Sequence, residues 1–237
     1  PSIFNHGFLE GRVGSFPGAL CFLLFLLQGL LACARFLSKC CRKADLFFAT
    51  AFVLMVPVIL LWGIPNSPSP DLPVIILSVV VAWIILTVSE KKERSGEHGV
   101  MDVKLLPLIL AVGAASIKLS ALPLVLVSGF FYLLGSHGVF LFKRGIVAGS
   151  VIVIGLVPIA LAGIMTSGCA FFPVAHLCFD LPWSLGAAAA EAETTAIKEW
   201  ARWGGPAPDS ATFWDWILRW IQIEKISVAL LFLSLIA

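Results

Sequence analysis

Lys118 is the only charged residue in a thirty-residue apolar run, 105–134. A lysine near the centre of a bilayer costs about 3 kcal/mol or more, so it is expected to face protein, water or an anionic ligand. A lysine ammonium suits phosphate, and the hydroxyls of Ser116 and Ser120 flank it as further donors. Two other roles remain open, an ion pair with a carboxylate of another segment and snorkelling to the membrane interface.

A second polar cluster lies near the start of the sequence, in NHGFLEGRVGS. His6 and Glu10 are four residues apart, a spacing that on a helix would suit a metal pair or an acid–base couple. Glycines at positions 7 and 11 oppose a helix, so a solvated loop is the simpler interpretation. We therefore treat His6 and Glu10 as catalytic candidates and Arg12 as a candidate substrate-binding cation.

Two cysteines bracket the segment FFPVAH. Cys169 and Cys178 could form a disulfide on an oxidising side of a membrane, or remain buried thiols. Together with His176 they could bind a metal, although no fourth ligand is evident.

Asp180 and Trp183 follow in the sequence CFDLPW. Asp180 is a third catalytic candidate, because it is the carboxylate beside this aromatic turn. Trp183 could stack on a sugar ring and is kept as a substrate-binding candidate, although burial of the loop is the simpler role. The later tryptophans 214, 216 and 220 are typical of a membrane-interface belt.

The composition is that of a polytopic membrane protein. Hydrophobic residues make up 59% of the 237 residues and charged residues 13%, against about 45–50% and about 25% in soluble domains. We predict an all-α transmembrane bundle, with membrane segments at 16–34, 46–63, 74–89, 145–166 and 226–237 and a hairpin of 105–117 with 119–135. Residues 167–215 form one long extramembrane loop with short helices. Because the sequence starts without methionine and ends within an apolar run, we expect one membrane domain of a longer chain.

The hairpin is one of two interpretations of residues 105–134. A single helix would be about 45 Å long, whereas the hydrocarbon core is about 30 Å thick. Prolines 107 and 123 and glycines 113 and 129 favour two short pieces, broken or re-entrant, with Lys118 at the break. The positive-inside rule favours the single span. The hairpin places ten Lys and Arg inside and six outside, whereas the single span places twelve inside and three outside, with Lys118 within the membrane.

Three stretches resemble a family of bacterial polytopic membrane proteins similar to GT-C-type glycosyltransferases. They are GFLEGRVGSF at 7–16, IKLSALP at 117–123 and SGCAFFPVAHLCFDLPW at 167–183, about 35 residues in all. The resemblance implies that Arg12, Lys118 and the 167–183 segment share the external side around a lipid-linked phosphate and its sugar. The family's catalytic acid is expected in an early external loop before residue 1. The two cysteines have no role in that family.

These observations lead to one main functional expectation and two rivals. The first is an integral membrane glycosyltransferase-like protein that takes a sugar from a lipid-phosphate donor at the external face of the bacterial inner membrane. The rivals are a non-catalytic subunit of a larger membrane complex and a transporter. Expected partners are membrane lipids, a lipid-linked sugar and other membrane subunits, and no nucleic acid. No cofactor motif or soluble-enzyme signature is present, and a divalent metal is left open.

Overall fold

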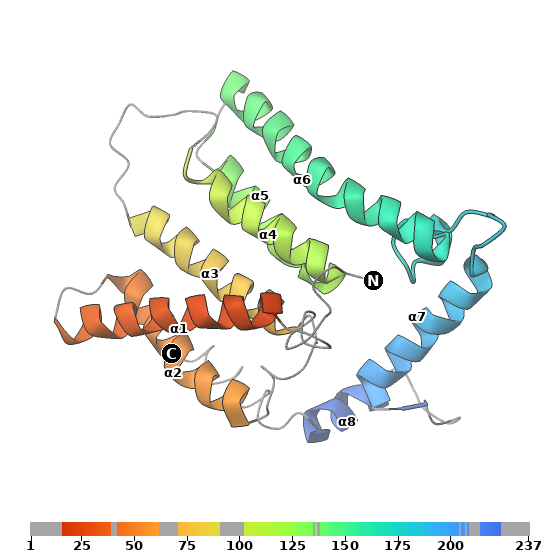
Figure 1. Cartoon of the computed structure of the whole chain (residues 1–237), viewed down its shortest axis with the longest axis horizontal. Helices are drawn as coiled ribbons and strands as arrows, with labels where there is room; N and C mark the ends of the chain where they lie inside the picture. Colours follow the sequence, from red (N-terminus) through yellow and green to blue (C-terminus); the bar gives the residue numbers. More distant parts are fainter. Residues whose placement is uncertain are drawn as a thin grey trace, which may run out of the picture. The chain divides into compact units, whose positions relative to one another are not determined.

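The computed structural model describes residues 16–38, 42–61, 71–90, 102–134, 136, 138–203, 205–206, 208 and 214–223. These residues form an all-α fold without a strand (Figure 1). The helices are α1 Phe16–Leu37, α2 Lys43–Leu61, α3 Asp71–Glu90, α4 Leu105–Ile117, α5 Leu122–Leu133, α6 Gly138–Ser167, α7 Gly186–Trp203 and α8 Asp215–Ile223, with 3₁₀ turns η4 Leu119–Ala121 and η5 Ala175–Leu177. The chain divides into two compact units, Pro1–Val157 and Pro158–Ala237. We describe each unit by itself.

Helices α1, α2, α3 and α6 are long and apolar enough to cross a membrane. Each has at least 19 residues, and about 20 residues span the roughly 30 Å hydrocarbon core. Large apolar side chains on these helices remain exposed, including Leu24, Leu60 and Ile154. Lipid accounts for such faces, because nothing in water would favour them. The prediction of an all-α integral membrane protein is therefore confirmed.

One helix starts earlier than the sequence pattern predicts. The predicted span 145–166 excludes Lys143 and Arg144, whereas α6 begins at Gly138 and carries both cations. Arg144 is buried and bonded to Tyr132 of α5 and to Asp102, just before α4, so its charge does not end the helix. The predicted last segment, 226–237, lies outside the described residues.

Aromatic side chains join α1, α2 and α3. The Phe25 ring centroid lies 5.3 Å from that of Phe48, and Phe48 packs edge-on against Trp83 at 5.5 Å. Gly29 allows this close approach of α1 and α2, because a β-carbon there would overlap the ring of Phe52.

A second apolar core joins α3, α4, α5 and α6. Gly129, late in α5, lies near Leu108, early in α4: a methyl group at Gly129 would be 3.9 Å from Leu108 Cδ1. The two short helices therefore run antiparallel, and Val112 of α4 packs over Gly155 of α6.

Within the unit Pro158–Ala237, α7 and α8 hold each other through two cation–aromatic contacts. The Arg202 guanidinium lies 5.6 Å from the Trp216 ring centroid, and that of Arg219 lies 5.8 Å from the Trp203 centroid. Each helix contributes one arginine and one tryptophan, an arrangement that fixes their register.

Candidate functional site at the Lys118 break

Lys118 occupies an interruption of the backbone. It is extended (φ −148°, ψ 121°), and its N–H still closes the last turn of α4 on Ala114 O. Its carbonyl accepts from Ala121 N–H at 3.0 Å, which forms the single turn of η4. Pro123, in the first turn of α5, suits a helix start because no intrahelical acceptor exists there for its missing N–H. The structure therefore divides 105–134 at the residue where the sequence analysis placed the break, and no single helix covers the run.

The charge of Lys118 has a partner 47 residues away. Its Nζ donates to Asp71 Oδ1, at the first residue of α3. Both side chains are about half exposed, 42% for Lys118 and 49% for Asp71. Asp71 also makes a further interaction beyond this pair. The site is thus a half-exposed cation and carboxylate at a helix break and a helix N-terminus.

The two serines beside Lys118 differ in their surroundings. Ser116 Oγ donates to the carbonyl of Gly113 at 2.6 Å, so its proton is used within α4. Ser120 is exposed on η4, two residues beyond Lys118. Ser120 is therefore the better placed hydroxyl for a ligand at the break.

A second ion pair anchors the hairpin at its other end. Arg144 of α6 donates to Asp102 Oδ2, just before α4, and to Tyr132 O near the end of α5 at 3.0 Å. The guanidinium also lies 5.1 Å from the Tyr132 ring centroid. Arg144 therefore ties the start of α6 to both open ends of the hairpin.

The ion pair of Lys118 with Asp71 lies at the first residue of α3, and a second set of polar contacts, which includes Arg35, lies towards its last residue. At the far end of α3, Glu90 Oε1 accepts from Ala44 N–H at 2.9 Å. Close by in sequence, Asp45 pairs with Arg35 at 2.7 Å. Asp71 and Glu90 are the first and last of the 20 residues of α3, so they lie about 28 Å apart along the helix axis.

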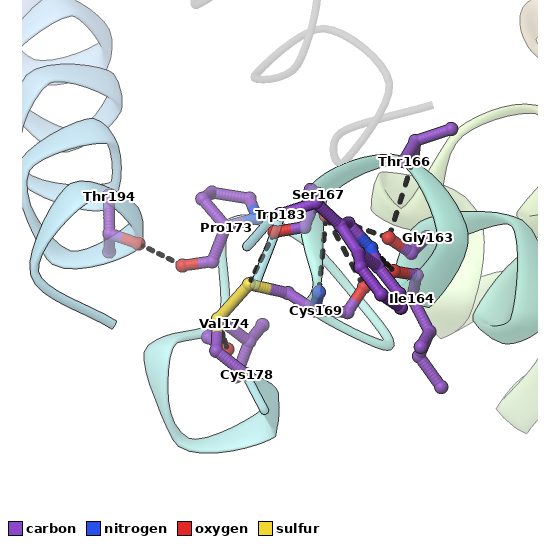
Figure 2. The surroundings of a disulfide bond; sticks show 10 residues. All are labelled: Gly163, Ile164, Thr166, Ser167, Cys169, Pro173, Val174, Cys178, Trp183 and Thr194. Atoms are coloured by element: carbon purple, nitrogen blue, oxygen red, sulfur yellow. Dashed lines mark hydrogen bonds between the residues drawn. A yellow bond between two sulfur atoms is a disulfide. The ribbon is translucent and has the colours of Figure 1, made fainter. Parts of the chain in front are cut away.

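The two cysteines are joined in a disulfide within the unit Pro158–Ala237 (Figure 2). The sequence left three interpretations open, a disulfide, buried thiols and a metal site, and the structure contains the disulfide. Cys169 is fully buried, and the loop it closes contains a cis peptide bond before Pro173.

The disulfide loop is fixed to the helices on either side. Ser167 Oγ accepts from Cys169 N–H at 3.2 Å, and Thr194 Oγ1 of α7 donates to Pro173 O at 2.6 Å. Gly163 of α6 allows the loop to approach, because a β-carbon there would lie 2.6 Å from Cys169 O. The segment is a closed structure held at both ends.

Trp183 contacts the end of α6 with its polar atom. Its indole N–H donates to Ile164 O at 3.3 Å, while the side chain stays largely exposed (Figure 2). Asp180 is exposed in the same segment. Both belong to the unit Pro158–Ala237, whereas Lys118 and Ser120 belong to Pro1–Val157. The N-terminal candidates His6, Glu10 and Arg12 lie outside the described residues.

No group of three or more His, Cys, Asp or Glu side chains gathers in a metal-binding arrangement within the described residues. His176 is exposed on η5. The sulfurs of Cys169 and Cys178 are bonded to each other, and a disulfide offers no thiolate to a metal.

Asp71 is the site residue that sequence reasoning missed. It lies near the end of the segment IPNSPSPDLP, whose composition predicts a turn, and it directly precedes an apolar run. The hairpin interpretation itself contains a signal: it places the start of α3 and the break between α4 and α5 at the same end of the bundle.

Fold and site together define a helical integral membrane protein with an ion pair at a broken helix. The chain belongs to the family described as a domain of unknown function (DUF8201), whose model matches residues 1–237. No curated protein and no solved structure matches it. The resemblance to GT-C-type glycosyltransferases rests on the three sequence stretches alone.

Proposed function

We propose that this protein is a membrane glycosyltransferase-like protein that uses a lipid-phosphate sugar donor, with the donor phosphate held at Lys118. The observation that carries the proposal is the half-exposed ammonium of Lys118 at the interruption between α4 and α5. An intramembrane cation marks a functional site by default, and interrupted helices occur where backbone lines a protein-enclosed or wet cavity.

The pairing with Asp71 is compatible with ligand binding. An exposed ion pair contributes only about 0–1 kcal/mol, so a phosphate carrying one or two negative charges can compete with the carboxylate for the Lys118 ammonium. Displacement by phosphate would leave the carboxylate of Asp71 beside the reacting groups. Ser120 offers an additional donor to the phosphate oxygens.

The proposed transfer uses these groups as follows. An acceptor hydroxyl attacks the anomeric carbon of the donor sugar, and the bond from that carbon to the phosphate oxygen breaks. The lipid phosphate leaves with the electron pair, and Lys118 stabilises its charge. The acceptor proton passes to the carboxylate of Asp71.

The positions of the cations support a proposed orientation in the membrane. Cations favour the cytoplasmic side, and Arg35, Lys43 and Arg144 belong to helix ends away from Lys118. This arrangement supports an external position for Lys118, at the outer face of the bacterial inner membrane. A disulfide between Cys169 and Cys178 is compatible with an external loop, because that side is oxidising.

Lys118→Met tests the proposal, because methionine keeps the length of the side chain and removes its charge. Purified protein in lipid nanodiscs is incubated with polyprenyl-phosphate sugars, with water as the acceptor hydroxyl, and released polyprenyl phosphate is measured by mass spectrometry. We expect at least a hundredfold loss of release with a thermal midpoint within a few degrees of wild type. Ser116→Ala is the matched control, because among the described residues its hydroxyl bonds only to Gly113 O, within α4. Full release by Lys118→Met would refute the mechanism.

A non-catalytic subunit of a larger membrane complex is the second candidate. The observation that favours it is that Asp71 already neutralises Lys118 between two helices, which suffices for a structural role. In that case the wild-type protein would show no transfer activity, and Lys118→Met and Asp71→Asn would change none. The protein would also co-purify with partners in fixed stoichiometry.

A further inference from the structure

A cavity of ≈ 330 Å³ lies among α1, α2 and α3, separate from the Lys118 break. Its volume is at the lower end of the range for small-molecule sites, about 300–1,000 Å³. The lining is polar although the helices are apolar: Gln28, Arg35, Arg42, Asp45, Trp83 and Thr87.

The lining carries an excess of positive charge. Arg35 Nη2 pairs with Asp45 Oδ1 at 2.7 Å, and the Asp45 side chain is only 8% exposed. The carboxylate of Asp45 is therefore committed to one of the two arginines. Arg42 has no ion-pair partner among the residues the structure describes. One guanidinium charge of the cavity thus remains available to an anion.

The wall also contains hydrogen-bond donors without acceptors in the described part of the chain. Arg35 Nε and Trp83 Nε1 are both buried and unbonded. The Trp83 indole cannot turn freely, because its ring packs edge-on against Phe48. Gln28 places an amide two helical turns before Arg35, within an otherwise apolar stretch of α1. A polar ligand rich in oxygen acceptors is what such a lining recognises.

We propose that this cavity binds a phosphate oxyanion, with the phosphate at Arg42 and Arg35 and the polar remainder of the ligand towards Gln28. The ligand is either the headgroup of an anionic lipid or a free phosphate compound. The cavity lies where α1 ends and α2 begins, so lipid tails could follow the exposed apolar faces of these helices. The proposal is independent of the transferase function.

Binding is measured on the purified chain in a neutral detergent by native mass spectrometry. Phosphatidylglycerol, phosphatidylcholine and inorganic phosphate are titrated separately. We expect phosphatidylglycerol to bind at least fivefold more tightly than phosphatidylcholine. Specific retention of inorganic phosphate, with the same dependence on Arg42, would identify a soluble phosphate source for the same site.

Two variants and one control locate the binding. Arg42→Gln and Gln28→Leu should each raise the dissociation constant at least fivefold. Arg42 is exposed, so its replacement should not impair folding. Lys43→Gln removes the neighbouring exposed cation, which does not line the cavity, and should change the constant less than twofold. Equal losses in Arg42→Gln and Lys43→Gln, or equal binding of both lipids without phosphate retention, would overturn the proposal.

Discussion

Replacement of Arg144 by glutamine should destabilise the protein strongly. The Arg144 side chain is 4% exposed and that of its partner Asp102 is 21% exposed. Removal of one member of a buried pair leaves an uncompensated charge, at a cost of about 3–5 kcal/mol. Because Asp102 keeps some solvent contact, we expect the lower value, about 3 kcal/mol, which includes the lost bond to Tyr132 O.

Thermal unfolding in detergent, followed by circular dichroism at the helical band, measures this change. About 3 kcal/mol corresponds to a midpoint lowered by about 6–12 °C for a domain of this size. Arg144→Lys should give an intermediate loss, because a single ammonium cannot reproduce the planar fork that reaches two acceptors.

Two further variants give the experiment its control and its refutation. Lys143→Gln removes an exposed cation from the same turn of α6 and should shift the midpoint by less than about 2 °C. Asp102→Asn combined with Arg144→Gln should cost less than the sum of the two single changes, because the stranded carboxylate is gone. If Arg144→Gln behaves like Lys143→Gln, the anchoring of the hairpin by this pair is wrong.

Two other predictions concern packing and the disulfide. Gly29→Val should destabilise the α1–α2 contact by about 1–3 kcal/mol, because the ring of Phe52 occupies the space a side chain would need, and a midpoint equal to wild type would contradict this. Cys169→Ser should weaken closure of the loop to Cys178 by about 2.5 kcal/mol, from the loop entropy of a crosslink with sequence separation 9. Limited proteolysis within 170–182 should therefore be faster in the variant. A reductant should accelerate proteolysis of the wild-type protein but not of the variant.

The class of protein and the place of the break could be predicted from the amino-acid sequence. Composition and the length of the apolar segments predict helical membrane spans. A helix of about 20 apolar residues is long enough to cross the bilayer, and it satisfies its own backbone hydrogen bonds there. The division at Lys118 was also predictable, since thirty residues are too long for one untilted span and prolines and glycines interrupt them. Both are local properties of the chain.

Which charged groups pair with each other depends on the packing of the helices and could not be predicted from the sequence. The partners of Lys118 and Arg144 lie 47 and 42 residues away along the chain, and pairing at such separations depends on how helices pack. The start of α6 shows the same effect, because the ion pair with Asp102 allows the buried Arg144 to lie inside the helix. The sequence left three roles open for Cys169 and Cys178, and the fold joins them. Charged residues and cysteines in an apolar chain are easily recognised in the sequence, but their partners depend on how the helices and loops pack.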